Sequence, residues 1–214
     1  MRKSLVVVGV ALLFSMTAGA WNYPQWEAFA GYNFIRYNPD SAFVPSFNLN
    51  GGNGQIAYNF NKWFSGVVDA GAATKGSIGG YNQLNTTLAY ITAGPRVTFG
   101  RDSRFQPYVQ ALFGGSYWHA STPITPLGLF VLPGFGPSPF LPGSTRVSNG
   151  EWGFAMLVGG GVDIKVSKHF YVRPVEASYF LTHMSNPFVP FSDNTTRNNF
   201  RYSGGLKVTW GEPK

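Results

Sequence analysis

His183 and Ser185 stand two residues apart, and their types and spacing fit nucleophilic catalysis. A serine hydroxyl attacks as a nucleophile once a nearby imidazole takes its proton. Residues two apart on a β-strand face the same way, so these two side chains could meet. A carboxylate should then orient the imidazole. However, residues 197–201 read Arg-Asn-Asn-Phe-Arg and the nearest carboxylate belongs to Asp193, so the catalytic set is incomplete.

The sequence contains no motif for a metal site or a cofactor site. His119, His169 and His183 show no metal-ligand spacing, and the chain has no cysteine, so we expect no metal site. Glycines 114–115 and 159–161 do not follow the phosphate-binding patterns that open a helix, and inside strands they would allow a sheet to curve. We therefore predict no cofactor and no enzyme activity.

Seven charged residues occupy the polar positions of segments in which polar and apolar residues alternate: Glu27, Asp69, Arg96, Asp163, Arg173, Arg201 and Lys207. If these segments close around an interior, the charges face it, where an isolated charge is costly. We expect them to form a paired, hydrogen-bonded network. The alternative is an ion or solute path along the network, which a narrow interior disfavours.

The segments that must position these side chains have the period of β-strands. In the last one, Phe200 to Trp210, apolar residues alternate with Arg201, Ser203, Lys207 and other small or polar residues, and period two indicates a strand. Weaker alternation completes a set of eight predicted strands, at residues 26–37, 50–60, 63–73, 87–99, 105–117, 151–165, 169–182 and 200–210.

The seventh predicted strand contains an irregularity. Arg173 and Glu176 have opposite parity, although each would be expected on the polar face. This predicts a β-bulge near Pro174, because proline lacks the amide donor that a regular ladder requires.

The predicted connections alternate between short and long. Residues 61–62, 100–104 and 166–168 are short, whereas 38–49, 74–85, 119–150 and 183–198 are long. Seven aromatic residues gather beside the short connections: Phe60, Trp63, Phe64, Phe99, Phe105, Phe170 and Trp210. Short turns on one side, longer loops on the other and an aromatic girdle are typical of outer-membrane barrels.

The start of the chain predicts export. Met1-Arg2-Lys3 precedes an apolar run, Leu5 to Phe14, and the small residues Ala18-Gly19-Ala20, the pattern of a secretory signal peptide. We expect residues 1–20 to be cleaved and residues 21–214 to form one domain. No later stretch of 18 apolar residues follows, so a membrane-bound form would have to be a closed barrel.

The composition limits the remaining choices. Only 12% of residues are charged and 17% are aromatic, against about 25% charged in a typical soluble domain. The net charge is +7, but the basic residues are scattered, so we expect acidic lipid headgroups rather than nucleic acid as their counterparts. A soluble periplasmic barrel with its apolar face inward is the structural alternative, since alternation alone does not say which face is inside.

The final strand carries the most specific motif. Ser203, Gly205, Val208 and Trp210 fit the pattern polar-x-Gly-x-x-apolar-x-aromatic, and Glu27–Tyr32 fits a first strand. In these features the chain resembles the outer-membrane β-barrel domain family, of the OmpA and OmpX type, in which this pattern is the insertion signal. One departure is the tail after Trp210, because family members often stop at the aromatic residue.

This resemblance implies an all-β fold, an eight-stranded antiparallel up-and-down transmembrane β-barrel, in the cell outer membrane of a Gram-negative envelope. It also implies a monomer whose partners are outer-membrane lipids, lipopolysaccharide and the barrel insertion machinery, with no nucleic acid.

Three functional hypotheses remain open. The first is a structural, adhesive or surface-contact role without catalysis. The second is passive transport of small apolar solutes, motivated by the apolar residues between Leu127 and Phe140. In the third, His183-Met184-Ser185-Asn186 is similar to the His-x-Ser-Asn segment of the lipid A deacylase family. That resemblance implies Ser185 as nucleophile and His183 as base, although a histidine at the barrel rim is the simpler interpretation.

Overall fold

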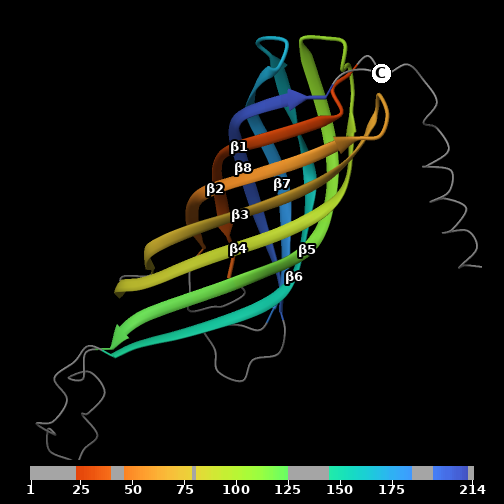
Figure 1. Cartoon of the computed structure of the whole chain (residues 1–214). Coiled ribbons are helices and arrows are strands. Elements are labelled where there is room, and N and C mark those ends of the chain that lie inside the picture. The colour runs from red at the N-terminus through yellow and green to blue at the C-terminus, as the bar shows by residue number, and fades with distance from the viewer. Residues whose placement is uncertain (1–22, 40–45, 79–80, 125–144, 185–194, 212–214) are drawn as a thin grey trace, which may run out of the picture.

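The computed structural model describes residues 23–39, 46–78, 81–124, 145–184 and 195–211. Its eight strands are β1 (Trp26–Tyr37), β2 (Phe47–Asn59), β3 (Phe64–Ile78), β4 (Tyr81–Thr98), β5 (Phe105–Ile124), β6 (Thr145–Lys165), β7 (Phe170–Met184) and β8 (Thr195–Trp210). Each strand pairs with the next in antiparallel fashion, and β8 returns to β1, so the sheet closes into a barrel (Figure 1). The predicted eight-stranded all-β barrel is confirmed.

In these ranges no helix is long and apolar enough to cross a membrane.

The barrel has two different ends. The turns β2–β3, β4–β5 and β6–β7 lie together with the end of β8, at the top of Figure 1, and we call this the short-turn end. The β2–β3 turn is held by Asn61, whose Oδ1 accepts hydrogen bonds from the amides of Trp63 and Phe64, both at 2.8 Å. Gly100 supplies a left-handed conformation in the β4–β5 turn, with φ of 63°, which glycine adopts without steric cost.

At the short-turn end every predicted strand boundary lies within one residue of the observed one. At the opposite end β1 ends at Tyr37 as predicted, and the other seven strands run further than predicted. Residues 74–85 were expected to form a long connection, which is wrong: β3 continues to Ile78, which pairs with Tyr81. The β5–β6 ladder likewise continues to the pair Ile124 and Thr145. Polar residues there hide the period-two signal, although the main chain still pairs. The apolar stretch Leu127–Phe140 lies outside the described residues.

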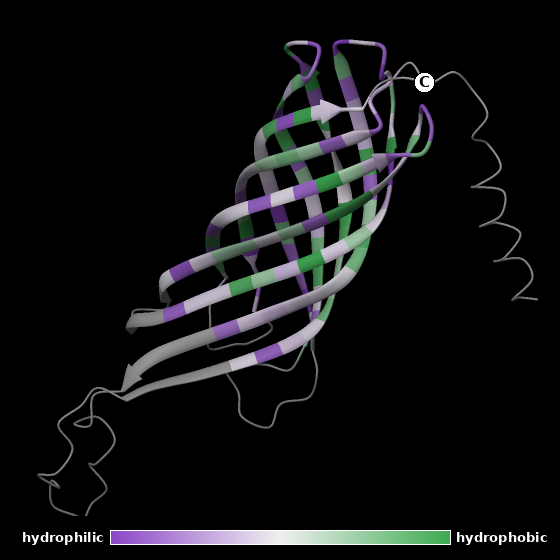
Figure 2. Cartoon of the chain, in the orientation of Figure 1, coloured by the Kyte–Doolittle hydropathy of each residue, from purple (hydrophilic) through white to green (hydrophobic). Residues whose placement is uncertain are grey.

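The strands present apolar residues on the exterior, and in the half of the interior next to the short-turn end they turn polar and charged residues inward. Figure 2 shows hydrophilic and hydrophobic positions alternating along the strands. The seven aromatic residues of the predicted girdle all face outward, with 36–58% of their surface exposed: Phe60, Trp63, Phe64, Phe99, Phe105, Phe170 and Trp210. An apolar exterior is the arrangement of a transmembrane barrel, whereas a soluble barrel would turn a polar face to the outside.

The outward orientation predicts a depth-dependent cost for a charge on the barrel exterior. Val158 lies in the middle of β6 with 41% of its surface exposed. Replacing Val158 with arginine should lower the free energy of unfolding by about 2–4 kcal/mol, because an arginine at mid-membrane loses its hydration. Urea titration of the barrel in lipid vesicles, followed by tryptophan fluorescence, would measure this change.

A matched control is available in the β6–β7 turn. Val166 is 64% exposed and follows the last residue of β6, so Val166→Arg places the same side chain in water. An equal loss of stability in both variants would contradict a lipid-facing position for Val158.

Candidate functional site

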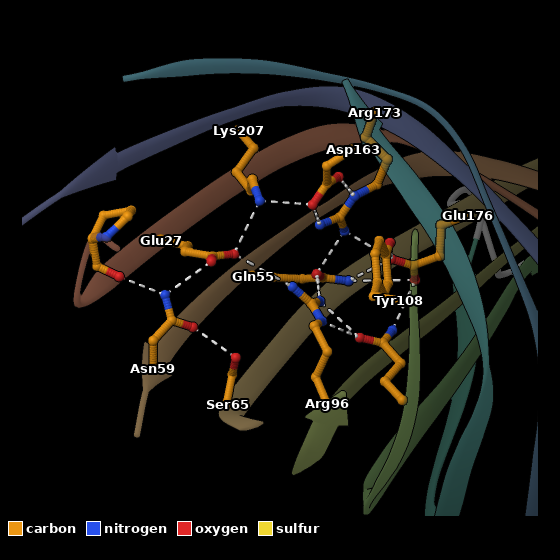
Figure 3. Close-up of polar contacts among 12 residues, drawn as sticks. Glu27, Gln55, Asn59, Ser65, Arg96, Tyr108, Asp163, Arg173, Glu176 and Lys207 are labelled. Atoms are coloured by element: carbon orange, nitrogen blue, oxygen red, sulfur yellow. Dashed lines mark hydrogen bonds and ion pairs between the residues drawn. The ribbon is translucent and has the colours of Figure 1, made fainter. Parts of the chain in front are cut away.

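A network of charged and amide side chains fills the half of the interior next to the short-turn end (Figure 3). The seven charged residues singled out in the sequence all lie there, each at most 4% exposed: Glu27, Asp69, Arg96, Asp163, Arg173, Arg201 and Lys207. Glu176 and Arg101 also belong to it. The network thus joins five cations to four carboxylates, so most of the buried charge is neutralised within it.

Glu176 is the hub of this network. Its carboxylate accepts hydrogen bonds from Arg173 Nη1 at 2.8 Å and from the Tyr108 hydroxyl at 2.6 Å, and it also pairs with Arg201. The amides of Gln55 and Gln110 each donate to it at 3.1 Å. A buried carboxylate with this many donors is compensated for the water that it has lost.

Glu176 was not among the residues predicted for the network, but the sequence contained the signal. The β7–β8 register shifts between Arg173 and Glu176, and the β6–β7 register shifts between Val162 and Ile164. The predicted bulge near Pro174 is therefore confirmed. Because the bulge inserts an extra residue, Arg173 and Glu176 both point into the barrel despite their opposite parity.

The guanidinium of Arg173 is enclosed by a carboxylate and two aromatic rings. Its guanidinium donates to both carboxylate oxygens of Asp163, at 2.7 and 3.2 Å. Its carbon centre lies 4.2 Å from the ring centroid of Phe29 and 4.6 Å from that of Tyr108. Two aromatic faces and a bidentate carboxylate hold the planar guanidinium in one orientation.

Glu27 collects the cations nearest the short-turn end. Its carboxylate lies 2.9 Å from Arg101 Nη1 and 3.2 Å from Lys207 Nζ. Arg101 comes from the β4–β5 turn, and it also donates to Asn59 and Ser65, at 2.8 and 2.6 Å. The strand pattern could not identify Arg101, because a turn residue has no fixed face. Its inward orientation follows from the folding of the turn over the barrel mouth.

Tyr90 joins the network to an apolar cluster in the other half of the interior. Its hydroxyl accepts hydrogen bonds from Arg201 at 2.7 Å and Asn33 at 3.0 Å, while its ring packs 5.3 Å from that of Phe180. Arg201 in turn pairs with Asp69 at 2.6 Å. The cluster beyond Tyr90 consists of fully or nearly fully buried apolar residues, among them Ile35, Tyr37, Phe47, Leu49, Leu88, Leu112, Trp118, Leu157, Phe180 and Met184.

Side chains fill the barrel interior, and this limits the functions that the network can have. Large side chains such as Trp118, Arg96 and Arg173 have less than 2% of their surface exposed, which matches an eight-stranded barrel whose interior is just wide enough for side chains. Within the described ranges, no group of three or more His, Cys, Asp or Glu residues is placed to hold a metal ion. The network braces the strands against one another.

The candidate catalytic pair is only partly described. His183 lies at the end of β7 on the outer face, and its Nδ1 is 2.9 Å from Thr196 Oγ1. In the described part of the chain, His183 has no carboxylate within 4.0 Å. Ser185 and Asp193 lie outside the described residues.

The residues of the predicted insertion signal occupy both faces of β8. Ser203 points inward and donates to Asn53 Oδ1 at 2.8 Å, whereas Val208 and Trp210 face outward. Trp210 stacks on Trp26, with ring centroids 6.5 Å apart. Gly205 pairs with Gly31 across the seam between β8 and β1.

Comparison with known proteins agrees with this architecture. The family model described as outer membrane protein beta-barrel domain matches residues 5–207. No curated protein matches the chain.

Three solved structures, of two proteins, show the same fold. Ail, the attachment invasion locus protein of Yersinia pestis, is 16% identical with a TM-score of 0.55, over 86% of this chain and 99% of Ail. Neisserial surface protein A is 15% identical with a TM-score of 0.55, over 87% of this chain and 97% of its own. Ail in complex with the heparin analogue sucrose octasulfate gives a TM-score of 0.51 at 17% identity, over 86% of this chain and 99% of that one. The family match and the inverted barrel together show that this chain belongs to the outer-membrane β-barrel proteins of the Gram-negative cell envelope.

Proposed function

We propose that this protein is a non-catalytic surface-contact protein that engages extended polypeptides outside the cell through the hairpin of β5 and β6. Short turns face the periplasm in barrels of this kind, so this hairpin projects outward. It continues beyond the neighbouring strands, at the lower left of Figure 1.

The observation that carries the proposal is a length of β6 edge that no described strand covers. In the described residues, pairing between β6 and β7 extends to Phe154 and His183, whereas β6 continues to Thr145 and stays paired with β5. Among the described residues, positions 145–152 of β6 therefore have no strand on the β7 side, because β7 ends at Met184, beside Gly153. An exposed edge is a template for another strand, and proteins use such edges to bind extended peptides.

The β5–β6 ladder shows which main-chain groups of β6 point away from β5. The amide of Lys165 donates to the carbonyl of Arg104, on the β5 side. Main-chain groups alternate in direction along a strand, so odd-numbered residues of β6 pair toward β5. Even-numbered residues such as Ser148 and Gly150 direct their amide and carbonyl groups to the opposite edge, where no described strand lies.

The outer face of the hairpin supplies side chains suited to recognition. Trp152 is 71% exposed, and its ring lies 5.0 Å from that of Tyr117. Exposed tryptophan and tyrosine are frequent at protein interfaces because their rings bury much area. The filled lumen and its paired charges favour this surface role over transport through the barrel.

Proline at the free edge tests the proposal. Ser148→Pro removes an amide that faces the edge and leaves the β5 ladder intact, so it should abolish contacts made by strand addition. Ser148→Ala, the matched control, keeps the amide. Cells that display the wild-type protein or Ser148→Ala should adhere to surfaces coated with extracellular-matrix protein, and cells that display Ser148→Pro should lose most of that adherence.

Heparin is a second coating for the same assay, because Ail has been crystallised with a heparin analogue. Adherence that survives Ser148→Pro, or wild-type cells that adhere no better than cells without the protein, would contradict the proposal. Folding of each variant in the outer membrane is checked by heat-dependent gel mobility of the outer-membrane fraction.

We further propose that β8 carries the signal for assembly and that residues 1–20 direct export. The outward position of Val208 and Trp210 supports this, because both side chains would be accessible to insertion machinery. The barrel then sits as a monomer among outer-membrane lipids and lipopolysaccharide.

A further inference from the structure

A cavity of about 340 Å³ opens at the short-turn end of the barrel. Its floor is formed by residues of the interior network, including Glu27, Arg101 and Lys207, and its rim by the β6–β7 turn and the end of β8. Small-ligand pockets occupy roughly 300–1,000 Å³, so the space suits a small molecule or a single headgroup. It lies at the opposite end of the barrel from the β5–β6 hairpin.

The lining of this cavity is strongly basic. Among the described lining residues, Arg101, Lys165, Lys168 and Lys207 face a single carboxylate, Glu27, so four positive charges against one negative charge leave +3 with histidine neutral. Arg101 and Lys207 share Glu27, and Lys207 also pairs with Asp163 at 2.8 Å. In the described ranges, Lys165 and Lys168 have no carboxylate within 4.0 Å. This uncompensated charge favours an anion.

Two buried polar groups in the lining lack a hydrogen-bond partner. Arg101 is 7% exposed and its Nε donates to nothing in the described structure, and Thr209 is 2% exposed with an unpartnered hydroxyl. A buried polar group without a partner costs about 1–3 kcal/mol. Such groups at the wall of a cavity are commonly satisfied by what occupies the cavity.

The donors in the lining match an oxyanion with several acceptor oxygens. His169 completes the set: its Nδ1 lies 3.1 Å from the carbonyl oxygen of Thr209, to which it must donate, and this fixes the imidazole at the rim. Guanidinium, ammonium and hydroxyl donors together are the groups that bind phosphate in proteins. We propose that the periplasmic mouth of this barrel binds a phosphate group, carried by a small soluble molecule or by a lipid headgroup.

Titration with inorganic phosphate tests this site. The full-length mature barrel is folded in maltoside micelles, which contain no phosphate, and heat of binding is measured. The wild type should bind phosphate saturably. The double variant Lys165→Gln/Lys168→Gln should bind phosphate at least about tenfold more weakly, because two unpaired cations are removed.

Lys62→Gln is the matched control. Lys62 lies in the β2–β3 turn at the same end of the barrel, 2.6 Å from Asp102, and does not line the cavity. The Lys62→Gln variant should bind phosphate as tightly as the wild type. Heat-dependent gel mobility verifies that each variant is folded. Absence of saturable binding, or an equal loss in Lys62→Gln and the double variant, would overturn the proposal.

Bilayer discs identify the source of the phosphate. The titration is repeated in discs of phosphatidylcholine with and without phosphatidic acid. If a headgroup occupies the cavity, phosphatidic acid should compete and weaken the apparent affinity for inorganic phosphate. If a soluble molecule is the natural ligand, the affinity should be equal in both discs.

Discussion

Glu176→Gln should lower the free energy of unfolding of the barrel by about 3 kcal/mol, because it leaves the guanidiniums of Arg173 and Arg201 in the interior with one carboxylate each. In the wild type, Glu176 pairs with both. It also accepts from Tyr108, Gln55 and Gln110. Urea unfolding in lipid vesicles, followed by tryptophan fluorescence and by heat-dependent gel mobility, measures the loss.

Asp102→Asn serves as the control for this prediction. Asp102 pairs with Lys62 at 2.6 Å, but both side chains are at least half exposed. Removing an exposed pair costs about 1 kcal/mol or less. Losses of similar size at Glu176 and Asp102 would mean that the buried network contributes no more than a surface pair.

The double variant Glu176→Gln/Arg201→Gln refines the same test. Removing a cation together with the carboxylate restores the charge balance, so the double variant should lose less stability than the two single variants combined. Strictly additive losses would show that the two groups are not coupled, against their direct contact.

Gly205→Ala should impair closure of the barrel and lower the free energy of unfolding by about 1–3 kcal/mol. A Cβ added at Gly205 would lie 2.2 Å from the carbonyl oxygen of Ala30 and 2.5 Å from the Cα of Gly31. Both atoms belong to the backbone of β1, at the seam where β8 closes the sheet. The strands would have to separate, which exposes main-chain groups that the membrane cannot satisfy.

Gly115→Ala is the matched control, because a Cβ there would lie 3.7 Å from the nearest atom, the carbonyl oxygen of Gly153. Refolding into detergent without any cellular machinery, scored by the heat-sensitive band on gels, should show a defect in Gly205→Ala and none in Gly115→Ala. A Gly205→Ala variant that refolds normally but assembles poorly in cells would contradict seam strain and favour recognition of β8 as a signal.

The local features of this fold could be predicted from the residues in order. Alternation with period two, as in Phe200 to Trp210, reflects the opposite faces of a single strand. The aromatic girdle and the boundaries at the short-turn end depend on positions close together in the chain. Even the bulge near Pro174 was visible, because proline and a parity conflict occur within four residues.

The predicted strand ends were wrong where polar and apolar residues did not alternate. Residues 74–85 contain polar residues on both faces, so their strands were not predicted, although the β3–β4 ladder continues to Ile78 and Tyr81. Outside the membrane neither face has to be apolar. The hydrogen-bonded ladder alone keeps the strands together there, and hydropathy does not report on it.

The sequence alone determined the strand count and the inventory of charges, because composition and period are properties of one segment at a time; the export signal is its prediction. The tertiary structure decided which of those charges meet. Arg201 and Asp69 are 132 positions apart and pair at 2.6 Å, and Arg101 reaches the interior from a turn. The basic cavity and the extension of β6 beyond its described pairing with β7 also depend on registers between strands, which are set by closure of the whole barrel rather than by any one strand.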